Sequence, residues 1–371
     1  MNNNMEEIKL EEMYLNLGPQ HPSTHGVLRV GLTLDGEVIV KADPDIGYLH
    51  RGMEKLAENR TYAQNIALSD RWDYLASMSN NFAFCLAVEK IMKVQIPERA
   101  EYIRVLVAEL NRIASHLILF GTYGVDIGAV TPFMYALRER EMILDLFESI
   151  CGARMTYNYF RIGGVSNDLP EGFVKKLEEF TEWFKKRLSE YDDLLSNNVI
   201  FLDRTKNIGM LTKEDAIDYG VTGPNLRASG VQFDIRKNDT YSIYSKFDFE
   251  IPVGTQGDCW DRYYIRIKEM KESINIIEQI LSKLPDGEIC TKVPKILRPP
   301  VGEVYSRIEA PRGELGIYLI SDGNTNPYRL KVRGPSFVNL EVLPELLKTW
   351  KIADVVAILG SLDIVLGEVD R

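Results

Sequence analysis

Apolar residues recur at helical spacing over several long stretches of the chain. Between Glu98 and Phe120 they fall on one face of a helix that Pro97 would start. The same period predicts one or two helices over 62–93. Further helices are expected from Pro132 to about 150, from 170 to about 195 and from 258 to about 284. Together these segments predict a central helical bundle over about 60–285, with residues 121–131 as a break that contains Asp126.

Strand-like alternation occurs near both ends of the chain. Residues 27–40 alternate around Asp35-Gly36, a dipeptide that favours a hairpin turn. Residues 303–332 alternate in the same way, with turns at Arg312-Gly313 and at 322–324. A helical bundle with small sheets from both ends is an α+β fold. We expect one domain over 1–371, with an N-terminal β portion at about 14–45 and a C-terminal β and tail portion at about 300–371.

Composition and charge narrow the possible partners. The 371 residues carry a formal charge of −10, and no basic block stands out. This balance argues against a nucleic-acid partner and against direct docking on anionic lipid. The acidic start predicts neither a secretory signal nor a transit peptide. No apolar run is long enough to predict a transmembrane helix, so we expect any membrane contact to come through another protein.

The four cysteines are scattered, and no two are separated by two residues. This spacing does not fit a zinc ribbon or the clustered ligation of most iron-sulfur proteins. Buried thiols in a reduced cytoplasmic chain are the simpler interpretation. The cysteines are Cys85, Cys151, Cys259 and Cys290.

Two of the four histidines, His21 and His25, lie in a loop at 16–29 that glycine and proline keep from forming a regular helix. A metal site is one interpretation, but zinc-binding pairs at this spacing normally lie on a helix with a glutamate between them. The imidazoles could also simply bond to neighbouring backbone. In a third interpretation the loop presents a proton donor to a substrate.

Blocks of sequence spread over the whole chain resemble one family. Asn16 to Arg29 is similar to the N-terminal signature of the 49 kDa subunit of respiratory complex I, called the D subunit in bacterial NADH-quinone oxidoreductase. The order of the later blocks matches that family as well. These blocks are 46–55, 70–74, 126–129, 152–155, 163–165, 227–230, 257–263, 308–314 and 360–371.

The resemblance implies a peripheral-arm component of a proton-translocating NADH-quinone oxidoreductase. Such a chain forms the site for the quinone head group and receives electrons from the terminal iron-sulfur cluster of a partner. It binds no cofactor alone, its substrate is menaquinone or ubiquinone, and another chain of the complex oxidises NADH. The implied partners are the iron-sulfur B subunit, the C subunit and the membrane H subunit. The implied location is the cytoplasmic side of the cell membrane, as a peripheral protein.

The resemblance also implies roles for individual residues. It assigns His25 and Tyr74 to the quinone head group, with Asp126 partnering His25 and raising its pKa by favouring the charged form. His21 would line the cavity or hold the loop. From the residues alone, a core aromatic in a helix is the commoner expectation for Tyr74, and a cap at a helix break is a strong alternative for Asp126.

A second set of residues would lie near the partner's iron-sulfur cluster. The family places an arginine there, matching Arg51 beside His50, where positive charge favours the reduced cluster. A surface charge pair is the alternative. Thr156 stands where many relatives carry a histidine thought to make the cluster potential depend on pH. We therefore expect a lower, pH-insensitive potential that suits menaquinone. His116 lies on an apolar helix face and is expected to be a core histidine.

The family further resembles the large subunit of nickel-iron hydrogenases, whose metal is held by cysteine pairs near both ends of the chain. The corresponding regions here, 70–74 and 363–371, contain no cysteine, so thiolate ligation of nickel is excluded. Two alternatives to an NADH-linked enzyme remain open. One is the same subunit in a deazaflavin- or ferredoxin-linked quinone or phenazine oxidoreductase. The other is a non-catalytic structural subunit of a hydrogenase-like assembly.

Overall fold

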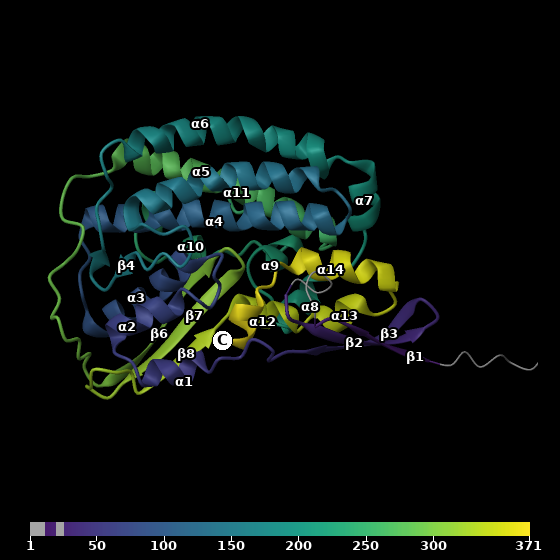
Figure 1. Ribbon diagram of the computed structural model, residues 1–371, viewed down its shortest axis with the longest axis horizontal. Coiled ribbons are helices and arrows are strands. Elements are labelled where there is room, and N and C mark those ends of the chain that lie inside the picture. Colours follow the sequence, from purple (N-terminus) through teal and green to yellow (C-terminus); the bar gives the residue numbers. More distant parts are fainter. Residues whose placement is uncertain (1–11, 20–25) are drawn as a thin grey trace, which may run out of the picture.

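A layer of four long helices dominates the computed structural model, which describes residues 12–19 and 26–371. Helices α4 (Glu98–Asp126), α5 (Thr131–Cys151), α6 (Phe173–Tyr191) and α11 (Cys259–Lys283) lie side by side (Figure 1). Local signals set their ends, because Pro132 occupies the first turn of α5 and the Asp258 carboxylate caps α11 by accepting from Asp261 N at 2.8 Å. This layer is the predicted helical bundle.

Helix α4 is buried along most of its length, including charged residues on the face opposite its apolar stripe. The helix continues to Asp126, so the prediction of a break from residue 121 is wrong. Gly121 and Gly124 allow the continuation, because a Cβ on Gly121 would lie 3.0 Å from the Phe133 backbone and one on Gly124 would lie 3.1 Å from the Ala129 carbonyl oxygen. The glycines therefore let the end of α4 pack tightly against the start of α5.

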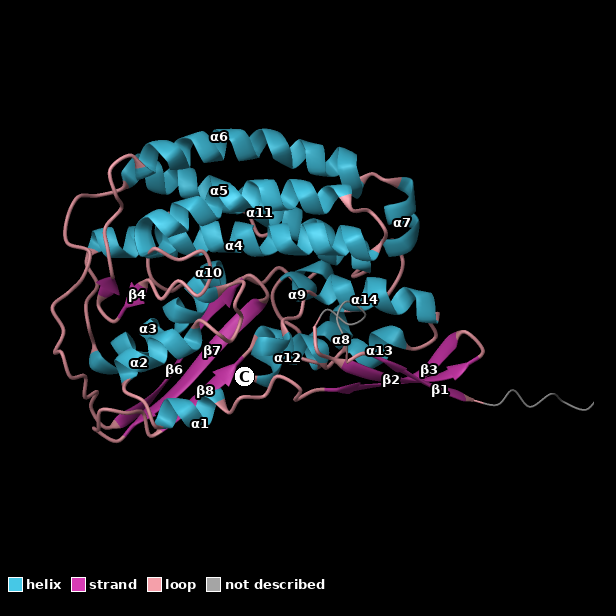
Figure 2. Cartoon of the chain, in the orientation of Figure 1, coloured by secondary structure: helices cyan, strands magenta, loops and turns pink. Residues whose placement is uncertain are grey.

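The C-terminal sheet lies on the other side of the molecule, with α3 (Ser77–Met92) packed against it (Figure 2). Its antiparallel order is β6 (Gly302–Ala310), β7 (Gly313–Ser321) and β8 (Arg329–Arg333). Ala310 pairs with Gly313, so Arg312 lies in the tight turn between β6 and β7. The Arg312 side chain is nevertheless buried.

The N-terminal sheet is a three-stranded antiparallel unit in the order β1 (Met13–Leu17), β2 (Arg29–Asp35) and β3 (Val38–Asp45). The predicted hairpin forms at Asp35-Gly36, where Gly36 has a φ of 61°. Apolar residues of β2 and β3 join those of two C-terminal helices in a separate hydrophobic cluster, α13 (Leu343–Leu347) and α14 (Val355–Leu362).

Shorter elements connect these units. The helix expected from 170 to about 195 begins at Phe173 and ends at Tyr191, where the chain continues as a π-helical turn, η1 (Asp192–Ser196). The remaining elements are α1 (Met53–Glu58), α2 (Tyr62–Ser69), β4 (Phe160–Arg161), β5 (Gly164–Val165), α7 (Val199–Thr205), α8 (Lys213–Asp218), α9 (Pro224–Ala228), α10 (Ile235–Asn238), η2 (Tyr244–Lys246), α12 (Pro335–Leu340), η3 (Ile352–Asp354) and α15 (Leu366–Asp370).

The observed mixture of a helical layer and small antiparallel sheets confirms the α+β prediction. The assignment of the whole chain to one domain stays a prediction. Within residues 12–19 and 26–371, no helix combines the length and the apolar character needed to cross a membrane.

Candidate functional site

Tyr74 lies in the loop between α2 and α3, with 40% of its surface exposed. Buried side chains hold the loop backbone in place. Ser77 Oγ donates to the carbonyl of Tyr74 at 3.2 Å, Asn80 donates to that of Asp73 at 2.9 Å, and Asn111 donates to that of Leu75 at 3.0 Å. These hydrogen bonds fix the backbone from which the Tyr74 side chain projects.

The last helix of the chain forms the wall beside Tyr74. A Cβ on Gly367 would lie 2.8 Å from the carbonyl oxygen of Trp72 and 3.6 Å from Cδ1 of Tyr74, so this close approach requires glycine. The preceding residue, Leu366, packs against Gly26, where a Cβ would meet its Cδ1 at 3.1 Å. Neighbouring residues of α15 thus touch Tyr74 on one side and the end of the histidine loop on the other.

The two loop histidines, His21 and His25, lie outside the residues that the structure describes. Gly26 directly follows His25 in the sequence and has a φ of 134°. Asp126 is the last residue of α4 and is half-buried. One turn earlier, the Tyr123 hydroxyl donates to the carbonyl of Ala357 in α14 at 3.0 Å. The C-terminal segment 355–370 therefore borders both the end of α4 and Tyr74.

A buried ionic cluster includes Asp73, the residue next to Tyr74. Arg312 donates to Asp73 Oδ2 at 2.5 Å and to Asp363 Oδ1 at 3.1 Å, and all three side chains are buried. Glu368, one residue after Gly367, is buried as well. We call Asp73, Arg312, Asp363 and Glu368 the Tyr74 cluster.

Two members of this cluster, Asp73 and Arg312, act on the titration of Tyr74. Burial raises the pKa of the phenol, the Asp73 carboxylate raises it further, and Arg312 lowers it. Burial also raises the pKa of Asp73, with Arg312 opposing that effect and Asp363 adding to it. The pKa of Glu368 is raised to about 7, mainly by burial and then by Asp73. Within the cluster, Glu368 is therefore the acid whose charge changes near neutral pH.

Two residues predicted to lie near an iron-sulfur cluster, Arg51 and Thr156, lie in segments that contact the loop before Tyr74. Arg51 Nη2 donates to the carbonyl of Arg71 at 2.8 Å, and Asn158 N donates to Asp70 Oδ1 at 3.4 Å. Thr156, two residues before Asn158, has a φ of 51° in this turn. Arg51 and the turn that carries Thr156 thus approach adjacent residues of the Tyr74 loop.

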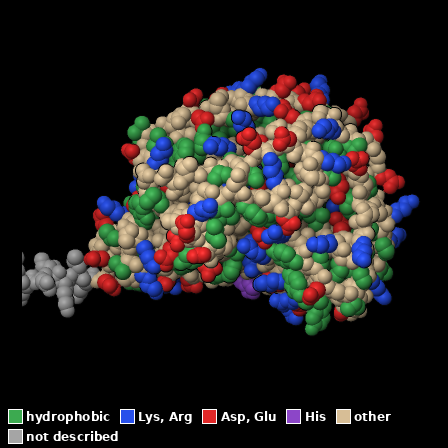
Figure 3. Space-filling view, turned by 180° about the vertical axis from the view of Figure 1, so that it is seen from behind, with side chains coloured by type: hydrophobic (Ala, Val, Ile, Leu, Met, Phe, Trp, Pro, Cys, Tyr) green, Lys and Arg blue, Asp and Glu red, His purple; other side chains and the backbone are tan. Residues whose placement is uncertain are grey.

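His50 lies between this region and the C-terminus. Its Nδ1 is 2.6 Å from the carbonyl oxygen of Asp370, whose carboxylate accepts from Gly47 N at 2.8 Å and Leu49 N at 2.7 Å. The imidazole is exposed, and Figure 3 shows histidine atoms at the lower edge of the molecule beside lysine and arginine side chains. His50 therefore helps to fix the segment that carries Arg51.

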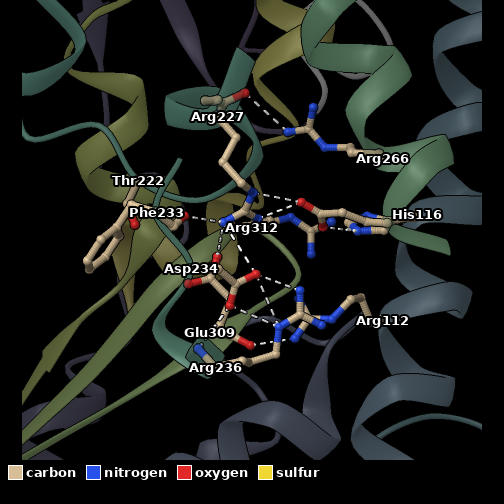
Figure 4. Close-up of polar contacts among 12 residues, drawn as sticks. Arg112, His116, Thr222, Arg227, Phe233, Asp234, Arg236, Arg266, Glu309 and Arg312 are labelled. Carbon is tan, nitrogen blue, oxygen red and sulfur yellow. Dashed lines mark hydrogen bonds and ion pairs between the residues drawn. The ribbon is translucent and has the colours of Figure 1, made fainter. Parts of the chain in front are cut away.

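His116 is buried, as expected for a core histidine, but it belongs to a second group of charges. Its Nε2 is 3.0 Å from Glu269 Oε2, and burial lowers its pKa while Glu269 raises it. Figure 4 shows the arginines and carboxylates of this group turned toward one another. We call it the interior network: Glu109, Arg112, His116, Arg227, Asp234, Arg236, Glu269 and Glu309.

Metal binding finds no support in the described part of the chain. No group of three or more histidine, cysteine, aspartate or glutamate side chains there could hold a metal ion. The four cysteines, all within the described ranges, are free, and two of them, Cys85 and Cys259, are buried.

Comparison with known proteins identifies the family. The family profile "Respiratory-chain NADH dehydrogenase, 49 Kd subunit" matches residues 126–300 and 294–371. The chain belongs to this 49 kDa subunit family. Curated relatives named as the D subunit of NADH-quinone oxidoreductase include one from Desulforamulus reducens, 58% identical over 98% of this chain and 99% of the relative. One from Bacillus cereus is 57% identical over 98% of this chain and all of the relative, and one from Bacillus anthracis is 56% identical over the same shares.

The sequence did not single out the charged residues that are buried in the Tyr74 cluster. Asp73, Arg312, Asp363 and Glu368 all lie in blocks that resemble the family, but nothing local pairs residues so far apart in the chain. Asp70 was missed for the same reason. Two signals were visible: an arginine in a tight hairpin turn, and acids within apolar C-terminal sequence.

Proposed function

We propose that this chain forms the quinone head-group site of an NADH-quinone oxidoreductase. The observation that carries the proposal is the shared wall at α15, where Gly367 touches Tyr74 and Leu366 touches Gly26. Because Gly26 follows His25 in the sequence, this wall brings the end of the histidine loop to the tyrosine. In this proposal the phenol and an imidazole serve one site, and such a pair suits a substrate with two carbonyl oxygens that each gain a proton.

Three residues carry the chemistry in this proposal. His25 donates a proton to one quinone carbonyl, and Tyr74 donates to the same or the other carbonyl. Asp126 partners His25 and favours its protonated form. The half-buried position of Asp126 at the end of α4, near the segment that also borders Tyr74, supports this role. His21 lines the cavity or holds the loop.

Electrons reach the quinone from the terminal iron-sulfur cluster of a partner subunit. The cluster lies near Arg51, His50 and Thr156, where positive charge favours its reduced state. The contacts of Arg51 with Arg71 and of Asn158 with Asp70 support this placement, because they adjoin the loop that carries Tyr74. Thr156 cannot titrate in this range, which suits a pH-insensitive cluster potential and menaquinone.

The same proposal covers the assembly. The chain is a peripheral-arm component that contacts the iron-sulfur B subunit, the C subunit and the membrane H subunit, on the cytoplasmic side of the cell membrane. Another chain of the complex oxidises NADH, and membrane subunits translocate protons. The whole chain folds as one domain that resembles a nickel-iron hydrogenase large subunit without its metal, so the vacated cavity serves the quinone.

The test of this function is NADH-driven quinone reduction by membranes that contain the complex with Tyr74→Phe. Removing a proton donor should lower quinone reduction by about a hundredfold or weaken the apparent quinone affinity. NADH oxidation by an artificial acceptor should persist and serves as the assembly control. Tyr328→Phe is the matched variant, because Tyr328 is 65% exposed and lies in the loop before β8. Unchanged quinone reduction in Tyr74→Phe would contradict a role for the phenol and favour a structural subunit.

A further inference from the structure

Glu368 is a buried acid without a cation of its own among the described residues. Its Oε2 accepts from the backbone N–H of Ser336 at 2.8 Å, whereas Oε1 is buried and has no hydrogen-bond partner in the described part of the chain. The nearest residue in sequence with a positive charge, Arg371, donates only to the backbone carbonyl of Glu368, at 3.1 Å. An isolated buried carboxylate is costly, so this environment favours the neutral acid.

Arg312, the arginine of the Tyr74 cluster, donates its hydrogen bonds to groups other than Glu368. Its Nη1 donates to Asp73 and to Ser115 Oγ at 3.0 Å, its Nη2 donates to Asp363 Oδ1, and its Nε donates to the Asp363 carbonyl at 2.9 Å. The only other cation beside these acids in the described residues is Arg266, whose Nε is 3.5 Å from Asp363 Oδ2. Three buried carboxyl groups therefore share two arginines, and neither arginine bonds to Glu368.

Two charged groups and one hydrogen-bond donor act on the ionisation of Glu368. Asp73, in the loop before α3, opposes its ionisation, while Arg312, in the β6–β7 turn, favours it. On the side of α12, Ser336 favours the ionised form by hydrogen bonding, and Gly334 packs against the side chain, with a Cβ there meeting Glu368 Cγ at 2.7 Å. The balance of burial and these groups brings the pKa of Glu368 to about 7.

We propose that Glu368 is a positioning residue of the quinone site: it holds one exchangeable proton for the Tyr74 cluster, and loss of that proton weakens Tyr74 as a proton donor. This inference rests on the proposed function. In this inference, Glu368 controls quinone reduction at neutral and alkaline pH. Glu368 directly follows Gly367, which lies in the wall beside Tyr74.

The proton step balances in the following way. The quinone accepts two electrons, delivered one at a time by a one-electron carrier of the partner subunit that is reduced twice, together with two protons, one from Tyr74 and one from the second donor of the proposed site. One proton leaves the Tyr74 hydroxyl, an O–H bond forms at the quinone oxygen, and a phenolate remains until solvent returns the proton. With Glu368 neutral, the phenolate adds one negative charge to the cluster. With Glu368 ionised, like charges oppose its formation, so Tyr74 is a weaker acid.

The test is the pH profile of NADH-driven quinone reduction in membranes with the complete complex. Between pH about 6 and about 9, the wild-type rate should fall about tenfold with a midpoint near pH 7. In Glu368→Gln, which cannot ionise, the ratio of the rates at the two ends should approach one. Glu345→Gln is the matched control, because Glu345 is exposed and paired with Lys348 at 2.6 Å, and it should keep the wild-type profile. An unchanged alkaline fall in Glu368→Gln would overturn the inference.

Further variants keep the result decisive. Where Glu368→Gln loses artificial-acceptor activity and so fails to assemble, Glu368→Asp decides, because its shorter side chain keeps the acid but changes its surroundings. A shifted midpoint in Glu368→Asp supports the inference, and an unshifted midpoint overturns it. Tyr74→Phe separates the two proposals. If Tyr74→Phe abolishes quinone reduction while Glu368→Gln keeps the alkaline fall, only the role of Glu368 fails.

Discussion

Two groups of buried charge in this molecule differ in how completely they are bonded. In the interior network, every carboxylate oxygen has a hydrogen-bond partner. Glu109, for example, accepts from Arg112, Arg236, Tyr244 and Ser273. In the Tyr74 cluster, Asp363 Oδ2 and Glu368 Oε1 are buried without a hydrogen bond from any residue that the structure describes. The carboxylates are therefore closed in the interior network and open in the Tyr74 cluster, although two buried donors of the interior network, Arg112 Nη1 and His116 Nδ1, also have no partner among the described residues.

The difference is clearest between Glu269 and Glu368, although burial also raises the pKa of Glu309 in the interior network. In the interior network, Arg227 and the hydrogen bond from His116 hold the pKa of Glu269 well below its ordinary value despite burial. In the Tyr74 cluster, the pKa of Glu368 is raised to about 7. Open acids beside a partly exposed phenol are where a proton can be exchanged during a reaction.

Removing an arginine from the interior network should give the largest effect on the free energy of unfolding. Arg227→Met removes the donor to Glu269 Oε1 at 2.5 Å and to Glu309 Oε1 at 2.8 Å, which leaves two carboxylates buried without their cation. We expect the free energy of unfolding to fall by about 3–5 kcal/mol. Urea unfolding of the chain, followed by the fluorescence of its four tryptophans, measures the loss.

An exposed ion pair is the control for that prediction. Arg329→Met removes the pair with Glu58 at 3.0 Å, where the arginine is 45% exposed. Its loss should change the free energy of unfolding by less than about 1 kcal/mol. A loss in Arg227→Met as small as this would show that the interior network does not stabilise the fold.

Asp70 is another buried acid with an oxygen that has no hydrogen bond in the described part of the chain, and its titration gives a test of the comparison by pH. It is fully buried, its Oδ2 has no hydrogen-bond partner within residues 12–19 and 26–371, and burial raises its pKa from 3.8 to about 7, which the hydrogen bond from Asn158 opposes. A pKa raised by folding means that the neutral acid's stabilisation is complete below pH 3.8 and is lost as pH rises through about 7. The slope is about 1.4 kcal/mol per pH unit between pH about 5 and about 7.

Asp70→Asn should remove that slope. The amide cannot ionise, and its oxygen can accept from Asn158 N as the carboxylate does. Urea unfolding of both proteins at several pH values checks this. Parallel pH dependence in Asp70→Asn and the wild type would place the titrating group elsewhere.

The smallest effect is expected from a change at Gly367, which lets α15 approach the loop that carries Tyr74. Gly367→Ala places a methyl group 2.8 Å from the carbonyl oxygen of Trp72, so the backbone beside Tyr74 must shift. We expect the apparent quinone KM to rise about tenfold with artificial-acceptor activity retained, because small displacements at a site are costly. An unchanged KM would show that this wall does not position the quinone.

The sequence predicted the parts of the fold that depend on local signals. The hairpin at Asp35-Gly36 and the helix start at Pro132 follow from residues that set backbone angles directly. The end of α4 at Asp126 did not follow. There, Gly121 and Gly124 have the usual character of helix breakers, and only the close approach of α5 explains why the helix continues.

For the candidate site, the sequence could point to Tyr74 and Asp126 only through family blocks. It could not reveal the Tyr74 cluster, since Arg312 and Asp73 are 239 positions apart and meet through tertiary packing alone. Nor does the pattern of α4 show that its charged face is buried. An amphipathic helix normally exposes such a face, and here α11 and the β6–β7 hairpin supply its partners instead.

The most direct test of a quinone site beside Tyr74 is photochemical labelling of the complete complex with an azidoquinone, followed by peptide mapping of this chain. The account predicts label on peptides that contain 70–76 and 363–371, and loss of that label when excess quinone competes. Label confined to other peptides, or label that quinone does not displace, would contradict it.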